Sequence, residues 1–208
     1  EQMQDPRDEI ARLQNTVQET GAFPEAAGRL PQMDAEVNEL ERTARRKKFM
    51  QEADQELARA DELGERANIA DLDEALGIYD RLAAKAQDVP DALFADTPDA
   101  GYREQLPQRI ADGRAEAEAR KAYREALTAA EAATDKRAKL RALQTAREQA
   151  QTVEPPAVVS ELTGRITSLE ADLAFEEGQR LERQAENVQD PQRRARLLAR
   201  AHSRYEKA

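Results

Sequence analysis

The apolar positions between Met33 and Ala67 follow helical spacing, but they change face partway along. The first stripe is Met33, Val37, Leu40 and Ala44, and the second is Phe49, Ala53, Leu57, Ala60, Gly64 and Ala67. Each stripe repeats every three or four residues, which is the period of one helix face. The step from Ala44 to Phe49 turns a helix by about 500°, so the second stripe is displaced by about 140°. The pattern predicts one long helix, of roughly 35 residues, whose two halves pack against different partners.

Four consecutive basic residues, Arg45 to Lys48, occupy the turn where the stripe changes face. A continuous stripe would place its next apolar residue at Lys47 or Lys48. We interpret these residues as marking the change of stripe. A basic docking patch is the alternative.

The same pattern recurs twice, over residues 102–133 and 157–188. Phe49, Tyr123 and Phe175 mark the changes of face. The stripes of the first of these helices are Leu106, Ile110, Gly113 and Ala117, then Tyr123, Leu127, Ala130 and Ala133. Those of the second are Val159, Leu162, Ile166, Leu169 and Leu173, then Phe175, Gly178, Leu181, Ala185 and Val188. Two further long helices are therefore expected.

Short helices are predicted to start at aspartates, which are favoured N-caps. These are Asp5, Asp71, Asp135 and Asp190, which lie 66, 64 and 55 residues apart. We expect Gly21 to end the first short helix. Proline-containing breaks are expected at Pro24 to Pro31, Val89 to Gly101 and Val153 to Pro156.

These elements predict an all-α fold: an elongated array of antiparallel helices in which long helices alternate with short ones. Each unit buries its apolar seam only against its neighbours, as in other helical arrays. The predicted units are residues 1–70, 71–134 and 135–189, with residues 190–208 as the start of a truncated fourth unit.

Two short segments resemble the second helix of a tetratricopeptide unit: Ala75-x-x-x-Tyr79 and Ala201-x-x-x-Tyr205-x-x-Ala208. The long helices that pass from one unit to the next resemble those of spectrin repeats. Both resemblances imply a helical-repeat fold with a scaffold or adaptor role. Neither implies any functional residue.

Composition narrows the classes of partner. The 208 residues are 36% charged and only 4% aromatic, which suits slender helical packing better than a thick core. The net charge of -10 disfavours nucleic acid as a partner, and no apolar run is long enough to insert into a membrane. There is no cysteine, so cysteine-ligated zinc and thiolate chemistry are excluded. Because the chain begins at Glu1 rather than Met, we expect a fragment of a larger protein.

No residue pattern points to catalysis. The single histidine, His202, lies about 100° around its helix from Ser203, and Ser160 and Ser168 lie on another predicted helix. We expect His202 to be a boundary residue. No glycine-rich phosphate loop occurs, so no nucleotide cofactor is predicted. We predict no catalytic and no cofactor-binding residue.

Four aspartates of the loop between Val89 and Gly101 and its start are candidate ligands for a metal ion. Asp88, Asp91, Asp96 and Asp99 supply the oxygen ligands that a hard cation prefers, but their spacing differs from that of the twelve-residue calcium loop. We interpret them as a solvated acidic loop and predict no metal ligand.

Charge is distributed unevenly along the chain. Residues 49–100 contain 14 acidic and 4 basic residues, whereas residues 175–208 contain 6 acidic and 8 basic ones. Arg193, Arg196, Arg200 and Arg204 are spaced to share one face of the last helix. This stripe is the candidate docking face for an acidic protein surface, including that of another copy. A solvated face opposite the apolar seam is the alternative.

The sequence therefore predicts a non-enzymatic helical-repeat scaffold or spacer that mediates protein–protein interaction, with the partner unidentified. Two alternatives stay open. One is a homotypic coiled coil that self-associates through its seams, against which the proline and glycine breaks argue. The other is a helical ligand-binding bundle, which would need a pocket with convergent polar groups.

Overall fold

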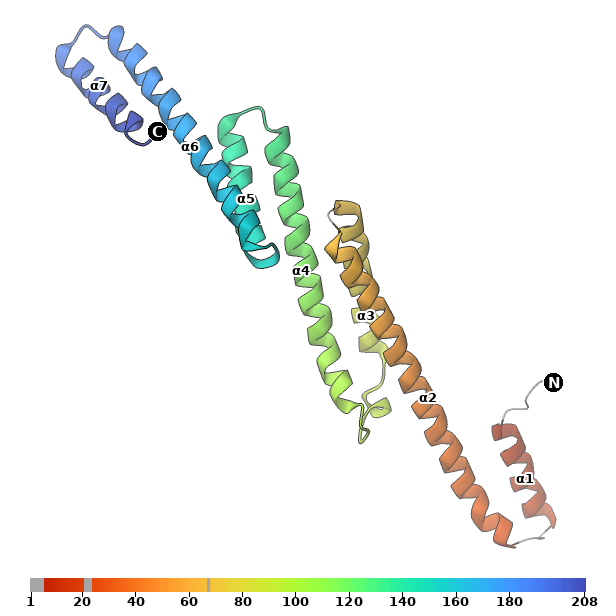
Figure 1. The fold of residues 1–208 in the computed structure, drawn as a ribbon. Coiled ribbons are helices and arrows are strands. Elements are labelled where there is room, and N and C mark those ends of the chain that lie inside the picture. The colour runs from red at the N-terminus through yellow and green to blue at the C-terminus, as the bar shows by residue number, and fades with distance from the viewer. Residues whose placement is uncertain (1–5, 21–23, 67) are drawn as a thin grey trace. The chain divides into compact units, whose positions relative to one another are not determined.

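The computed structural model of the chain describes residues 6–20, 24–66 and 68–208. Over these residues the chain is all-α, and long helices alternate with short ones (Figure 1). The long helices are α2 (Pro24–Glu65), α4 (Ala100–Ala132) and α6 (Pro156–Glu186); the short ones are α1 (Pro6–Thr20), α3 (Ile69–Asp88), α5 (Lys136–Val153) and α7 (Pro191–Tyr205), and a 3-10 turn, η1, spans Asp91–Leu93. The predicted all-α class and the alternation of long and short helices are confirmed.

The chain forms two compact units. The first consists of Glu1–Ala58 and Leu82–Gln108, and the second of Arg59–Arg81 and Arg109–Ala208. Helices α2, α3 and α4 contribute residues to both units. The elongated shape and the division into four sequence units stay predictions.

Aspartate side chains cap two of the short helices, as predicted. The Asp135 carboxylate accepts a hydrogen bond of 2.8 Å from the Ala138 amide at the start of α5. Asp190 accepts one of 2.9 Å from the Gln192 amide at the start of α7. Each bond satisfies a backbone donor that the first helical turn leaves without an intrahelical partner. Asp5 and Gly21 lie outside the described residues.

The prediction that Asp71 starts α3 is wrong. The side chain of Asn68 caps this helix, because its Oδ1 accepts a 2.8 Å hydrogen bond from the Asp71 amide. Asp71 lies in the first turn instead, where a negative charge interacts favourably with the helix dipole. Asparagine caps helices about as well as aspartate, so the two were not distinguishable by residue type.

The predicted break between Pro24 and Pro31 is also wrong. Helix α2 begins at Pro24, its first helical position, where proline is favoured. Pro31 lies inside the helix and gives up one backbone hydrogen bond. Leu30, immediately before it, is buried, so tertiary packing stabilises this turn against the low helix propensity of proline.

The core of the second unit is shared by three helices. Buried residues of α4, α5 and α6 form one apolar cluster: Tyr123, Ala126, Ala130, Leu143, Ala146, Ala150, Leu162 and Ile166. Alanines supply half of these positions, so the three helices approach closely with few bulky side chains. This arrangement agrees with the low aromatic content of the sequence.

Helix α4 changes its packing face, as predicted. Its first half packs on α3, where Gly113 lies beneath the ring of Tyr79. Its second half turns Tyr123 and Ala130 into the cluster with α5 and α6. The step from Ala117 to Tyr123 turns the helix by about 600°, which displaces the second stripe by about 120°.

Helix α6 repeats this change of face. Leu162 and Ile166, in its first half, are buried against α4 and α5. Leu181 and Ala185, in its second half, are buried where α6 packs on α7. One helix therefore belongs to two successive packing groups.

The first half of α2 departs from the expected packing. Met33 and Leu40 are 45% and 69% exposed, although they belong to a regular apolar stripe. The second stripe is buried, with Ala53, Leu57 and Ala60 at most 3% exposed. Within the described residues, only the second half of α2 therefore has a complete packing partner.

Candidate docking site

A small apolar seam holds α7 on α6. Ala201 is buried, and the ring of Tyr205 lies 5.5 Å from the ring of Phe175, centroid to centroid. The Tyr205 hydroxyl also donates a 2.7 Å hydrogen bond to Glu182 on α6. Since these contacts all face α6, they fix which side of α7 is left for a partner.

Gly178 allows this close approach. A Cβ atom at this position would lie 2.5 Å from Cε1 of Tyr205 and 2.8 Å from its Cδ1. Real Cβ contacts are never this short, so only glycine fits while the ring keeps its place. Gly113 and Tyr79 form an equivalent pair between α4 and α3, where the Cβ would lie 2.7 Å from the tyrosine hydroxyl.

The predicted arginine stripe divides into two parts. Arg193, Arg196 and Arg200 are exposed, and no acidic side chain of the described residues pairs with them. Arg204 is partly buried and pairs with Glu177 of α6, with 3.2 Å between Nε and Oε2. Helix α7 contains no acidic residue, so the three exposed arginines form an uncompensated cationic face.

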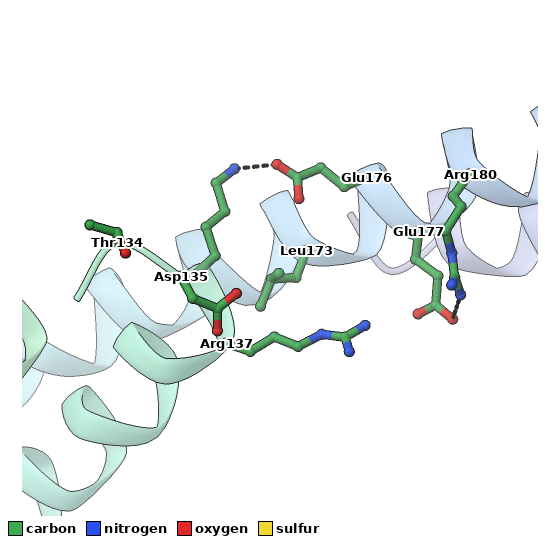
Figure 2. A pocket seen from close by; sticks show the side chains of 8 residues that line it. Thr134, Asp135, Arg137, Leu173, Glu176, Glu177 and Arg180 are labelled. Carbon is green, nitrogen blue, oxygen red and sulfur yellow. Dashed lines mark hydrogen bonds and ion pairs between the residues drawn. The ribbon is translucent and has the colours of Figure 1, made fainter.

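A groove of about 490 Å³ lies between α6 and the turn that joins α4 to α5 (Figure 2). Figure 2 shows Leu173 pointing from α6 toward Asp135 and Arg137, which come from the start of α5. Charged side chains form most of the wall. The lining residues are Thr134, Asp135, Lys136, Arg137, Leu173, Glu176, Glu177 and Arg180.

Ion pairs neutralise much of this wall. The Lys136 ammonium lies 2.6 Å from Glu176 and 3.5 Å from Asp172. The hydrogen bond that Lys136 donates to Glu176, helped by the negative charges of both carboxylates, raises the pKa of Lys136. This lysine therefore stays charged throughout the physiological range and is unsuited to act as a base.

Glu177 connects the groove with α7. Its carboxylate lies 3.6 Å from Arg180 in the groove wall and 3.2 Å from Arg204. The groove and one end of the arginine stripe therefore share a carboxylate. Together they can bind a charged segment by ion pairing, with Leu173 as an apolar contact.

His202 lies on the exposed surface of α7. Its Nε2 is 3.4 Å from Glu206, one helical turn away, and its side chain is 76% exposed. The serines Ser160 and Ser168 belong to the first half of α6, away from the α6 residues that contact α7. The structure therefore places no serine of α6 beside His202.

Sequence reasoning missed the role of Arg46. It interpreted Arg45 to Lys48 as a change of stripe or a basic patch, but Arg46 is only 6% exposed. Its Nε donates a 2.7 Å hydrogen bond to Asp99, and its guanidinium also reaches the Leu93 carbonyl at 3.4 Å. Arg46 therefore fastens the loop between α3 and α4 to α2.

The rest of this loop packs on α2 as well. Phe94 is 2% exposed, and its ring meets that of Phe49 edge to face at 6.0 Å. The expectation of a solvated acidic loop is therefore wrong for Asp99, and Asp91 pairs with Arg103 at 3.3 Å. Phe94 is the one aromatic residue of this loop and was the available signal, but spacing alone could not identify its partner.

No protein-family model, no curated protein and no solved structure matches the chain. In the described part of the chain, no three metal-ligating side chains gather in one place, and no helix is long and apolar enough to cross a membrane.

Proposed function

We propose that the chain is a non-enzymatic helical-repeat scaffold or spacer that mediates protein–protein interaction. The observation that supports this most directly is the shared use of α4. One half of this helix packs on α3, and the other half packs in the cluster with α5 and α6. Units that share a helix transmit orientation from one to the next, which is what a spacer requires.

The long shared helices favour the spectrin-like form of this architecture. Helices α2, α4 and α6 contain 42, 33 and 31 residues, each well above the mean length for globular proteins. The two tetratricopeptide-like segments lie in α3 and α7, where Tyr79 and Tyr205 each pack on a helical glycine. These tyrosines therefore serve helix packing in the proposal.

Docking is assigned to the exposed arginines of α7. Arg193, Arg196 and Arg200 offer charge-assisted hydrogen bonds to carboxylates, and each guanidinium can bind bidentately. The surface acts geometrically and electrostatically, with no covalent step.

Small-angle scattering tests the spacer part of the proposal. We expect a dilute monomer whose radius of gyration is well above the roughly 17 Å of a compact domain of this length. A value close to the compact one would overturn the spacer.

A flexible oligoglutamate peptide tests the docking face. We expect the protein to bind this probe at low salt, and Arg196→Glu with Arg200→Glu to weaken binding at least several-fold. The matched control is Arg141→Glu with Arg183→Glu, which makes the same charge change at exposed positions of α5 and α6. If both double variants weakened peptide binding equally, net charge alone would explain the binding, and the proposed docking face would be refuted.

A further inference from the structure

Helix α7 carries a regular row of cations that no carboxylate of the described residues compensates. This arginine row consists of Arg193, Arg196 and Arg200, which are all exposed and follow each other at intervals of three and four residues. Ala201 is buried where α7 packs on α6. Arg193 and Arg200 lie about 80–100° around the helix from Ala201, and Arg196 lies about 140° from it. The row therefore points away from the seam that holds α7 on α6.

A row of the same length meets its partner between α4 and α3. Arg114 and Lys121 of α4 are seven residues apart, as the first and last arginines of the row are. The Arg114 guanidinium lies 2.9 Å from the carboxylate of Asp80 on α3. The Lys121 ammonium lies 2.6 Å from Asp73, seven residues before Asp80. Two cations seven residues apart on one helix thus pair with two carboxylates seven residues apart on another, in antiparallel order.

Helices α5 and α7 are also matched to an acidic helix. Helix α5 has five basic residues and one acidic residue, whereas α6 has seven acidic and three basic ones. Lys136 of α5 pairs with Asp172 and Glu176, which are one turn apart on α6. Arg204 of α7 pairs with Glu177 of the same helix. Both cationic short helices therefore lie beside a helix that presents carboxylates about one turn apart.

The spacing of the arginine row matches that of a second helix. From Arg193 to Arg200 the axis of α7 rises by about 10.5 Å, and carboxylates at positions i and i+7 of another helix rise by the same amount. In an extended chain the side chains of one face recur about every 6.6 Å, so three of them span about 13 Å and fall out of step with the row. A helix can therefore face all three guanidinium groups in register.

We propose that the arginine row binds an acidic helix of a partner protein, antiparallel to α7, with carboxylates at positions i, i+4 and i+7. These carboxylates face Arg200, Arg196 and Arg193 in turn, as Asp73 and Asp80 face α4. Each guanidinium can donate two parallel hydrogen bonds to its carboxylate. This inference rests on the docking face of the proposed function and specifies the chemistry and conformation of its partner.

Two helical peptides test this partner against the full chain. Both are built from alanine and glutamine, are about 20 residues long so that they are helical in water, and carry three glutamates. The aligned peptide has them at i, i+4 and i+7, within about 60° around its helix, and the spread peptide has them at i, i+2 and i+5, over about 200°. We expect the aligned peptide to bind about fivefold more tightly in fluorescence anisotropy at low salt, which is the gain that three exposed ion pairs supply. At ~0.5 M salt this preference should shrink.

A charge exchange tests which side chains face each other. Arg196→Glu should weaken binding of the aligned peptide, and a peptide with lysine in place of its middle glutamate should recover the loss. The matched control is Arg194→Glu, which makes the same charge change at an exposed position of α7, about 200° around the helix from Arg196. The lysine peptide should not bind Arg194→Glu more tightly than the aligned peptide does.

Three results would overturn the acidic helix as the partner. The first is equal binding of the aligned and spread peptides. The second is equal recovery of Arg196→Glu and Arg194→Glu by the lysine peptide, since net charge would then explain the binding. The third is a protein that binds oligoglutamate but not the aligned peptide, because its partner would then be extended. In each case the docking face of the proposed function would still stand on its own oligoglutamate result.

Discussion

Gly113→Ala is the sharpest test of how the long helices pack. Gly113 lies on α4 against Tyr79, whose ring is 2% exposed and whose hydroxyl donates a 2.5 Å hydrogen bond to Asp61. An added Cβ would meet the Tyr79 hydroxyl at 2.7 Å and the ring carbons Cε1 and Cζ at 2.8 Å. Because the ring is enclosed and tied to Asp61, it cannot move aside without losing contacts.

The expected magnitude follows from three contributions. Overpacking a filled site costs about 1–3 kcal/mol, and disturbing a hydrogen bond to a carboxylate costs up to about 2 kcal/mol. Alanine gains about 1 kcal/mol over glycine in helix propensity. We expect a net loss of roughly 2 kcal/mol, which lowers the melting temperature by about 4–8 °C for a chain of this size.

Gly164→Ala is the matched control for this substitution. Gly164 also lies within a long helix, α6, but a Cβ there meets nothing within 4 Å. The same substitution should therefore raise stability by about 0.5–1 kcal/mol, through helix propensity alone. Thermal unfolding followed by far-UV circular dichroism measures both variants.

The sign of the difference decides the outcome. Gly113→Ala should melt below the unaltered protein, and Gly164→Ala above it. A shift of both melting temperatures in the same direction would refute the close approach of α3 and α4. Tyr79→Phe combined with Gly113→Ala adds a check, since removing the hydroxyl should recover part of the loss.

Three further predictions concern stability. Leu143→Ala empties a position that is 1% exposed in the α4–α5–α6 cluster, so it should cost about 2–4 kcal/mol in urea unfolding; a loss below ~1 kcal/mol would contradict that core. Arg46→Leu removes the hydrogen bond to Asp99 and should speed amide hydrogen exchange at Phe94. Unchanged exchange at Phe94 would contradict the conclusion that Arg46 holds this loop on α2. Burial, followed by the hydrogen bond to Asp61, raises the pKa of Tyr79 in the folded state. The neutral tyrosine therefore stabilises the folded state below pH ~10, and this stabilisation is lost as the pH rises further. The urea midpoint should fall above pH ~10, and less steeply in Tyr79→Phe.

Much of the fold could be predicted because its signals are local. The aspartates at positions 135 and 190 start helices through hydrogen bonds that span two or three residues. The change of face in α4 and α6 follows from the spacing of apolar residues and the pitch of a helix. Local errors arose where two residue types serve the same purpose, as with Asn68 and Asp71.

The candidate site was predicted only in part. The four predicted arginines all lie on α7, and their role as a docking face stays a prediction. The sequence could not show that Arg204 pairs with Glu177 while Arg193, Arg196 and Arg200 are exposed. The groove beside α6 had no sequence signal, since its walls come from segments about 40 residues apart.

The sequence by itself determined which segments are helical, where most of them start, and which long helices present two apolar faces. Only the tertiary structure decided which faces are covered, that Arg46 is buried against Asp99, and that Leu40 and Leu198 stay open. The physical reason is that helix formation depends on residues within a few turns. Burial depends instead on which distant segment lies opposite, and the spacing of one helix says nothing about that.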